Sequence, residues 1–333
     1  MGDHTDYNDG FVLPMAIDRE CVVAARPRDD DRIRVSSNGE TAVIPPNASA
    51  TPEWARYVAG VARTLAERGR PDVGIDADVS SSVPQGSGLS SSAAFEVAIA
   101  LALCDAAQFE LDGTELARAC QDAEHRATGV PSGIMDQLTS IAGVAGAALL
   151  IDCRSLEYAP ANLPEELGVL AVHSGISRTL ERTAYAERRA ACEAAARRIG
   201  VPSLRDATLD DVRDDPAARH VVTENARVHA TADALRARDF AAAGALFRDS
   251  HASLRDDFRV STPELDLLVR ALEDAGAFGA RLTGAGFGGA VVAIALADDA
   301  DEIGGAAAAE YRRRTSREPT VYRCRAVIGA GPA

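Results

Sequence analysis

The order of apolar and polar residues along the chain predicts a mixture of strands and helices. Residues 73–79 place valine, isoleucine and alanine at every second position, with glycine and aspartate between them. This period of two is typical of a half-buried strand. Residues 52–69 instead carry large apolar side chains three or four positions apart, which predicts an amphipathic helix. Pro52 and Gly69 suit the two ends of that helix.

Similar patterns predict further elements. Strands are expected at 20–26, 32–36, 147–153, 167–175 and 319–326. Helices are expected at 89–108, 114–126, 180–199, 222–248, 262–276 and 299–314. Residues 279–296 predict a strand, a glycine-rich turn and a second strand. The chain is long enough for two domains or one large one, and the pattern of elements shows only a soft candidate boundary near 155–165.

Charge and composition narrow the classes of partner and compartment. The formal net charge is −15 and the isoelectric point about 4.9, which argues against nucleic acids and anionic membranes, because both attract basic proteins. No apolar run approaches the ~20 residues of a membrane span, and the polar first ten residues do not resemble a signal peptide. The six cysteines include no closely spaced pair, which fits a reduced cytoplasm.

The segment VPQGSGLSSSAA, residues 83–94, has the composition of a phosphate-binding loop. The common lysine-containing loop is excluded, because the sequence has no lysine. The remaining mechanism uses backbone N–H groups at a helix N-terminus, with Gly86 and Gly88 allowing an anion to approach closely. The following serine hydroxyls could bind phosphate or hold magnesium. The alternative is a plain connection between a strand and a helix.

Two acids further along are candidates for phosphoryl-transfer chemistry. Glu124 lies in an otherwise apolar helical pattern and could supply the carboxylate that magnesium needs beside phosphate oxygens. The alternative for Glu124 is a solvated helix acid. Asp136 follows a Pro-Ser-Gly turn between apolar residues and is either a helix cap, which periodicity favours, or a base for a hydroxyl group. His125 is expected to be a packed or surface histidine.

A second glycine cluster lies between the two strands predicted within 279–296. It comprises Gly284, Gly286, Gly288 and Gly289. A turn that needs positive φ explains one or two glycines. Four glycines indicate that the backbone closely approaches another group, although a tight structural turn is a competing interpretation.

Together these motifs resemble the GHMP kinase superfamily and, within it, the galactokinase family. GDHTDYNDGFVLPMAID is similar to the galactokinase signature, VPQGSGLSSSAA to the phosphate motif and LTGAGFGGAVVA to the third motif. GVPSGIMDQ, LLIDCRSLEY and SHASLRDDF are similar to stretches that separate galactokinases from mevalonate and homoserine kinases. Six segments in the family's order make the resemblance specific along the whole chain.

The resemblance implies a fold, a reaction and a set of site residues. The fold is an α+β, two-domain GHMP kinase fold. Residues 1–160 would form a ribosomal protein S5 domain 2-like N-terminal domain and residues 161–333 a ferredoxin-like C-terminal domain, with the active site in the cleft between them. The reaction is magnesium-dependent transfer of phosphate from ATP to the C1 hydroxyl of galactose, giving galactose 1-phosphate and ADP. By position, Asp136 matches the catalytic base, and Ser91 and Glu124 match the magnesium ligands. The sugar contacts match Asp3, His4, Asp6, Gly133 and Tyr185. The ATP site matches Pro84, Gln85, Gly86, Ser87, Gly88, Leu89, Ser90, Ser91 and Ser92.

Two departures from the family pattern bear on activity. Asp3 stands where the signature normally has glutamate, so its sugar contact is expected to be weaker or to pass through water. The family's Gly-Arg-Val-Asn-Leu strand would precede Met1, and its arginine stabilises charge near the transferred phosphoryl group. We expect upstream coding sequence to supply that strand, and poor activity without it.

Two other functions are compatible with the sequence. One is a kinase for a related sugar, such as N-acetylgalactosamine, arabinose or a uronic acid. The other is a catalytically impaired regulator that binds galactose and ATP. For the protein as a whole we expect galactose and ATP as partners, no nucleic acid or membrane partner, a cytoplasmic location, and a monomer or weak homo-oligomer.

Overall fold

The computed structural model describes residues 1–44, 52–176 and 181–332, and its contacts divide the chain into two compact units. Unit 1 comprises Met1–Asp18, Gln85–Leu89 and Val144–Val327. Unit 2 comprises Arg19–Pro84, Ser90–Gly143 and Ile328–Ala333. The units interleave along the sequence, whereas the predicted boundary near residue 160 divides the chain once. That boundary stays a prediction about the folding domains.

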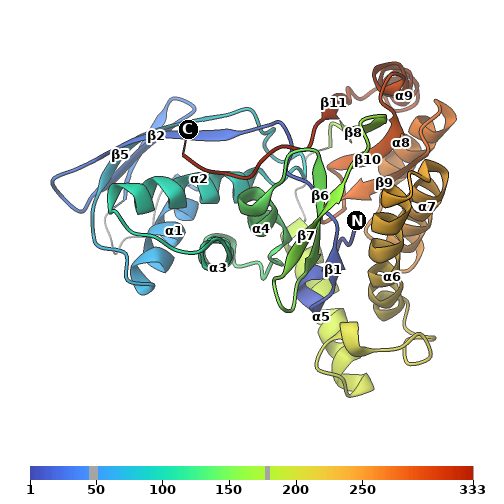
Figure 1. Ribbon diagram of the computed structural model, residues 1–333, viewed down its shortest axis with the longest axis horizontal. Helices are drawn as coiled ribbons and strands as arrows, with labels where there is room; N and C mark the ends of the chain where they lie inside the picture. Colours follow the sequence, from blue (N-terminus) through green and yellow to red (C-terminus); the bar gives the residue numbers. More distant parts are fainter. Residues whose placement is uncertain (45–51, 177–180, 333) are drawn as a thin grey trace. The chain divides into compact units, whose positions relative to one another are not determined.

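Unit 2 combines a mixed sheet with helices on one side of it. The sheet has the order β2-β5-β3-β4, and β5 pairs antiparallel with β2 and parallel with β3. Its strands are β2 (Cys21–Pro27), β3 (Ile33–Ser37), β4 (Glu40–Ile44) and β5 (Ile75–Ser81). Its helices are α1 (Ala55–Glu67), α2 (Ser91–Ala106), α3 (Gly113–Thr128) and α4 (Met135–Ala142). Figure 1 shows α1, α2 and α3 gathered on one side of β2 and β5.

The core of unit 2 follows from the two periodicities. Ile75 and Ala77, alternate residues of β5, are buried together with the apolar faces of α1, α2 and α3. Helices α1 and α3 approach each other closely at Gly60, where an added Cβ would lie only 2.8 Å from the carbonyl oxygen of Ala123. A glycine is therefore required at that crossing.

Unit 1 contains a four-stranded antiparallel sheet with the order β11-β8-β10-β9. Its strands are β8 (Leu167–His173), β9 (Gly279–Thr283), β10 (Ala290–Leu296) and β11 (Thr320–Cys324). Strand β8 is an unbroken apolar run because it is buried on both faces: Leu170 and Val172 belong to one core cluster, and Val169 and Ala171 to another. A second antiparallel sheet, β1-β6-β7, is formed by β1 (Phe11–Val12), β6 (Ala147–Asp152) and β7 (Tyr158–Asn162).

The helices of unit 1 complete its two core clusters. They are η1 (Asp6–Asn8), α5 (Glu181–Ile199), η2 (Leu204–Asp206), α6 (Pro216–Arg236), α7 (Phe240–Asp256), α8 (Pro263–Asp274) and α9 (Ala300–Thr315). Figure 1 shows α6 and α7 side by side, and their residues pack together. Helix α7 also packs against β9, which brings residues around position 250 next to Arg281.

The α+β prediction is confirmed, and most predicted elements are present. The stretch 222–248, predicted to be helical, is divided into α6 and α7. Arg238 adopts a left-handed φ of 57° between them, and Asp239 then caps α7 by accepting from the N–H of Ala242. Strands β1, β4 and β7 and the short helices η1, η2 and α4 were not predicted.

Two features of the structure bear on the sequence-based expectations about membranes and cysteines. None of the helices in the described parts of the chain is long and apolar enough to cross a membrane. All six cysteines are free.

Candidate functional site

The predicted phosphate loop has the backbone that close anion approach requires. Gly86 and Gly88 have φ values of 67° and 82°, and Ser90 has a left-handed φ of 58°. Ser90 is the N-cap of α2 but makes no side-chain cap bond. The first N–H groups of a helix have no partner within the helix, so the start of α2 presents donors and a positive dipole end to an anion. Pro84 precedes the loop, Gln85, Ser87 and Leu89 lie within it, and Ser91 and Ser92 open the helix.

Glu124 on α3 is the centre of a hydrogen-bonded cluster in unit 2. Its Oε1 accepts from Ser92 Oγ at 2.8 Å, and its Oε2 accepts from Ser132 Oγ at 3.0 Å and from Gln137 Nε2 at 2.8 Å. The alternative of a solvated helix acid is therefore wrong. The bonded serine on α2 is Ser92, one residue past the predicted ligand Ser91, whose role as a ligand stays a prediction. His125 is a packed histidine, with Nε2 2.8 Å from the carbonyl oxygen of Ser132.

The cluster around Glu124 suits a hard cation that is shared with phosphate. Among the residues described, no group of three or more histidine, cysteine or acidic side chains could hold a metal ion alone. Magnesium commonly takes one or two carboxylates, water and substrate phosphates. A carboxylate beside a serine hydroxyl at the start of a helix matches that requirement, so Glu124 and the α2 serines fit the predicted ion.

A second acid, Glu96, lies behind this cluster and was not predicted. It is fully buried on α2, and Gln137 Nε2 lies 3.3 Å from its Oε2. Burial, reinforced by the charge of Glu124, raises the pKa of Glu96 well above its usual value. The protonated form of Glu96 is therefore favoured over a wider pH range than for an exposed glutamate. The signal in the sequence was a lone acid within the apolar run of residues 93–103.

Asp136 lies in the first turn of α4, and Gly133 is buried just before that helix. The N-cap position of α4 is occupied by Ile134, whose apolar side chain makes no cap bond. The interpretation of Asp136 as the N-cap residue of a helix is therefore wrong. Asp136 is partly exposed in unit 2, which contains Glu124 as well. Its role as a base stays a prediction.

The polar N-terminal segment folds onto aromatic side chains of unit 1. His4 has a left-handed φ of 66°; its Nδ1 accepts from the Tyr7 hydroxyl at 2.9 Å, and its Nε2 donates to the carbonyl oxygen of Ala285 at 3.2 Å. Burial lowers the pKa of His4 to about 3, so its ring is neutral. The ring of Tyr185 lies 5.4 Å from those of His4 and Tyr7. Asp6 accepts from the N–H of Tyr7.

Asp3 is buried, with only 3% of its surface exposed. Its Oδ2 lies 2.5 Å from Nη2 of Arg281, and its Oδ1 accepts from the N–H of Gly284. Burial, the largest single influence, would raise the pKa of Asp3, but the charge and hydrogen bond of Arg281 together with neighbouring positive charges outweigh it and hold the pKa below the usual value. The unit therefore brings together Asp3, His4 and Tyr185 of the predicted sugar contacts, with the polar atoms of Asp3 and His4 bonded inside the protein.

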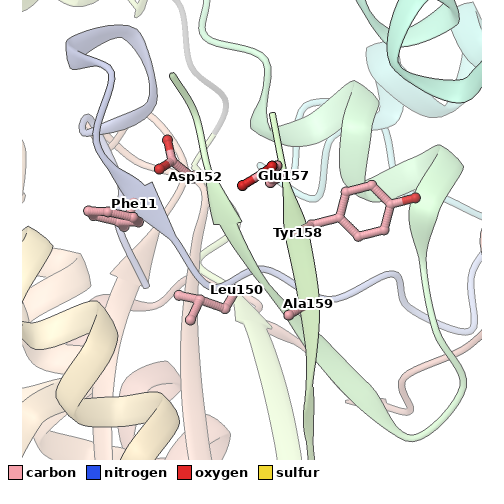
Figure 2. A pocket seen from close by; sticks show the side chains of 6 residues that line it. All are labelled: Phe11, Leu150, Asp152, Glu157, Tyr158 and Ala159. Carbon is pink, nitrogen blue, oxygen red and sulfur yellow. The ribbon is translucent and has the colours of Figure 1, made fainter. Parts of the chain in front are cut away.

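Figure 2 shows a different, open pocket in unit 1, of about 520 Å³. Strands β1, β6 and β7 form it, and its lining residues are Phe11, Leu150, Asp152, Glu157, Tyr158 and Ala159. None of the six is a predicted site residue. Asp152 is already paired with Arg205, whose guanidinium lies over the Phe11 ring.

Comparisons with known proteins agree with the motifs. Family profiles match residues 1–27, as the galactokinase galactose-binding signature, 56–144, as the GHMP kinases N terminal domain, and 231–313, as the GHMP kinases C terminal. A galactokinase of Chloroflexus aurantiacus is 44% identical over 351 residues, covering 99% of this chain and 90% of the relative. A galactokinase of Roseiflexus sp. is 43% identical with the same coverage.

Solved structures agree in fold. The Lactococcus lactis galactokinase complexed with galactose superposes with a TM-score of 0.95 at 30% identity, covering 100% of this chain and 92% of that one. A Methanococcus jannaschii mevalonate kinase superposes with a TM-score of 0.68 at 19% identity, covering 98% and 94%, which is a likeness of fold alone. The predicted two-domain GHMP kinase fold is confirmed.

Proposed function

Because the chain belongs to the galactokinase family of GHMP kinases, we propose that it transfers the terminal phosphoryl group of ATP to galactose at the C1 hydroxyl. The products are galactose 1-phosphate and ADP. The observation that carries this function is the 44% identity to a galactokinase over 99% of the chain, together with the galactose-binding signature at residues 1–27.

Asp136 is the proposed base. Its carboxylate takes the proton of the C1 hydroxyl as that oxygen forms a bond to the γ-phosphorus, and the bond from that phosphorus to the bridging oxygen of ADP breaks. The position of Asp136 in the first turn of α4 supports this role, because the residue is partly exposed and is not used as the cap of its helix.

The start of α2 is the proposed phosphate site. Backbone N–H groups after Gly88 and Ser90 donate to phosphate oxygens, assisted by the helix dipole. Glu124 with Ser91 or Ser92 would hold magnesium, which when bound neutralises charge on the ATP phosphates. The bonds from Ser92, Ser132 and Gln137 support this role, because they fix the orientation of the Glu124 carboxylate.

The proposed sugar contacts are Asp6, Tyr185 and Gly133, with Asp3 and His4 as weaker candidates. Carboxylate and phenol oxygens bind sugar hydroxyls well, and charge-assisted bonds are the stronger kind. Asp3 and His4 already use their polar atoms within unit 1. A cytoplasmic location and a monomeric or weakly associating state are further parts of the proposal.

The test is ADP release by the purified protein, measured with galactose, N-acetylgalactosamine, arabinose and galacturonic acid. We expect the highest kcat/KM with galactose, and galactose 1-phosphate as the product identified by phosphorus NMR. A higher kcat/KM with another of these sugars would reassign the substrate. Binding of galactose and ATP without any ADP release would instead support the regulator.

A further inference from the structure

Two motifs that are far apart in the sequence meet inside unit 1. Gly284 donates its N–H to Asp3 Oδ1 at 2.5 Å, and His4 Nε2 donates to the carbonyl oxygen of Ala285 at 3.2 Å. Consecutive residues of the N-terminal signature thus bond to consecutive residues of the glycine turn at 284–289. This direct contact between two motifs was not apparent from either motif alone.

Arg281 lies behind Asp3 and is 0% exposed. Its Nη2 is 2.5 Å from Asp3 Oδ2 and 3.8 Å from Glu224 Oε1, and its Nε donates to Ser250 Oγ at 3.0 Å. Ser250 in turn donates to Glu224 Oε1 at 2.7 Å. We call Asp3, Arg281, Glu224 and Ser250 the Asp3 clamp.

The clamp is a buried cluster of charged groups, so removing one of its charges is expected to destabilise the protein. Glu224 also pairs with Arg227 at 2.7 Å, so two carboxylates face two guanidiniums. Among the residues described, neither Nη1 nor Nη2 of Arg281 has a hydrogen-bond partner, so Nη2 contacts Asp3 as an ion pair. Removing the carboxylate of Asp3 would leave a buried arginine with less compensation, which is costly in a protein interior.

The glycine turn needs external support because its backbone is unusual. Gly284, Gly286, Gly288 and Gly289 all have positive φ, and Phe287 adopts a left-handed φ of 58°. Glycines have the largest freedom to lose on ordering, and a non-glycine residue at positive φ persists only where its surroundings fix it. The first residue of this turn, Gly284, donates its N–H to the carboxylate of Asp3.

We propose that Asp3 is a positioning residue for the glycine turn at 284–289, held in place by Arg281, and that its carboxylate does not serve primarily as a sugar ligand. The kinetic part of this inference rests on the proposed galactokinase activity, and the structural part does not. Both readouts below are therefore needed.

The structural test is hydrogen exchange of the unliganded protein with Asp3→Asn and, separately, Arg281→Lys. The first change keeps the size of the side chain and removes its charge, and the second keeps a positive charge and removes the fork geometry of the guanidinium. We expect exchange in residues 279–290 to accelerate about tenfold in both variants, as the turn opens more often. The control is Leu235→Ala, which creates a cavity in the same unit and does not alter a clamp residue. Exchange at 279–290 in this variant should remain within about twofold of the rate in the parent protein.

The kinetic test separates positioning from sugar binding. If Asp3 positions the turn, Asp3→Asn lowers kcat about tenfold or more, while the galactose KM changes less than about threefold. Unchanged exchange at 279–290 together with a raised galactose KM would assign Asp3 to the sugar and overturn the inference. Accelerated exchange in the variants of a parent protein that lacks kinase activity would support the clamp and refute the proposed function.

Discussion

Ser92 Oγ lies 2.8 Å from Glu124 Oε1, and this single hydrogen bond joins the first turn of α2 to α3. The predicted phosphate loop leads directly into that turn, and the hydrogen bond ties the serine-led start of α2 to the acid within unit 2. Ser132 and Gln137 occupy the other oxygen of the carboxylate. A group that is oriented from three sides is prepared for a ligand before the ligand arrives.

Replacing Glu124 with glutamine should raise the magnesium concentration needed for half-maximal activity by about tenfold to a hundredfold, since ligand-shell changes have effects of that size. Binding of ATP in the absence of magnesium should change little, because the backbone donors of α2 are retained. Magnesium titration of ADP release and a metal-free ATP-binding assay check the two parts. The matched control is Glu115→Gln on the same helix, whose carboxylate pairs with Arg118 at the surface. An unaltered magnesium requirement in the Glu124 variant would remove it from the metal site.

Asp136→Asn should lower kcat by about 10²–10⁴-fold, the usual contribution of a general base. ATP affinity should stay close to that of the parent, since the change keeps side-chain size and lies outside the phosphate loop. Steady-state kinetics and equilibrium nucleotide binding give the two values. Asp105→Asn, at the far end of α2, provides a comparison with the same chemical change. Full turnover by the Asp136 variant would require another base.

Glu96→Gln should stabilise unit 2 in a pH-dependent way. The pKa of Glu96 is raised by burial, so the folded state holds a proton that the unfolded state releases above its ordinary pKa near 4.5. This difference lowers the free energy of unfolding. The loss is absent below pH 4.5 and grows as the pH rises toward the folded-state pKa. Each unit of pKa difference between the two states is worth about 1.4 kcal/mol.

Glutamine carries no such cost, so the variant's gain in unfolding free energy should be larger at about pH 8 than at about pH 4.5. Urea unfolding at the two pH values measures it. An equal loss of stability at both values would mean that packing, and not the proton, decides the effect.

Gly60→Ala and Gly305→Ala should have opposite effects. A Cβ at Gly60 would lie 2.8 Å from the backbone oxygen of Ala123, and separating α1 from α3 should cost about 1–3 kcal/mol. Gly305 is exposed within α9 and has no atom within 4 Å of an added Cβ, so alanine there should add about 0.5–1 kcal/mol through helix propensity. Denaturation of each variant gives the sign. Stabilisation by alanine at position 60 would contradict the close crossing of α1 and α3.

Helices and strands with a clear hydrophobic periodicity could be predicted from the sequence. Elements that form only because they pack or pair with distant segments could not. Strand β5 and helix α1 show their period within the chain itself. Strand β7 is an edge strand with Pro160 in it, and four of its five residues are exposed, so neither hydrophobic alternation nor composition marked it. The boundary between α6 and α7 at Arg238 could have been predicted from the next residue, Asp239, because aspartate often caps the start of a helix.

The candidate site likewise contains residues that the sequence could point to and residues that it could not. Glycines, serines and lone acids made residues 84–92, Glu124 and Asp136 candidates, because such residues are unusual in apolar surroundings. Their partners could not be predicted, since Ser132 and Gln137 reach Glu124 only through the packing of α3 and α4. The sequence contained a weak indication that Arg281 is unusual, because it is an arginine inside an otherwise apolar strand. Nothing near it in the sequence indicated that its partner is Asp3.

Because unit 1 is built from segments at both ends of the chain, its parts are synthesised at widely separated times. Gly284 and Asp3 are 281 positions apart, and the segment around Asp18 pairs with the segment around Arg325. During synthesis, residues 1–18 therefore leave the ribosome long before the partners that they will contact. Until then the early segment exposes apolar groups that its late-made partners will cover, and exposed apolar surface of this kind promotes aggregation of incomplete chains.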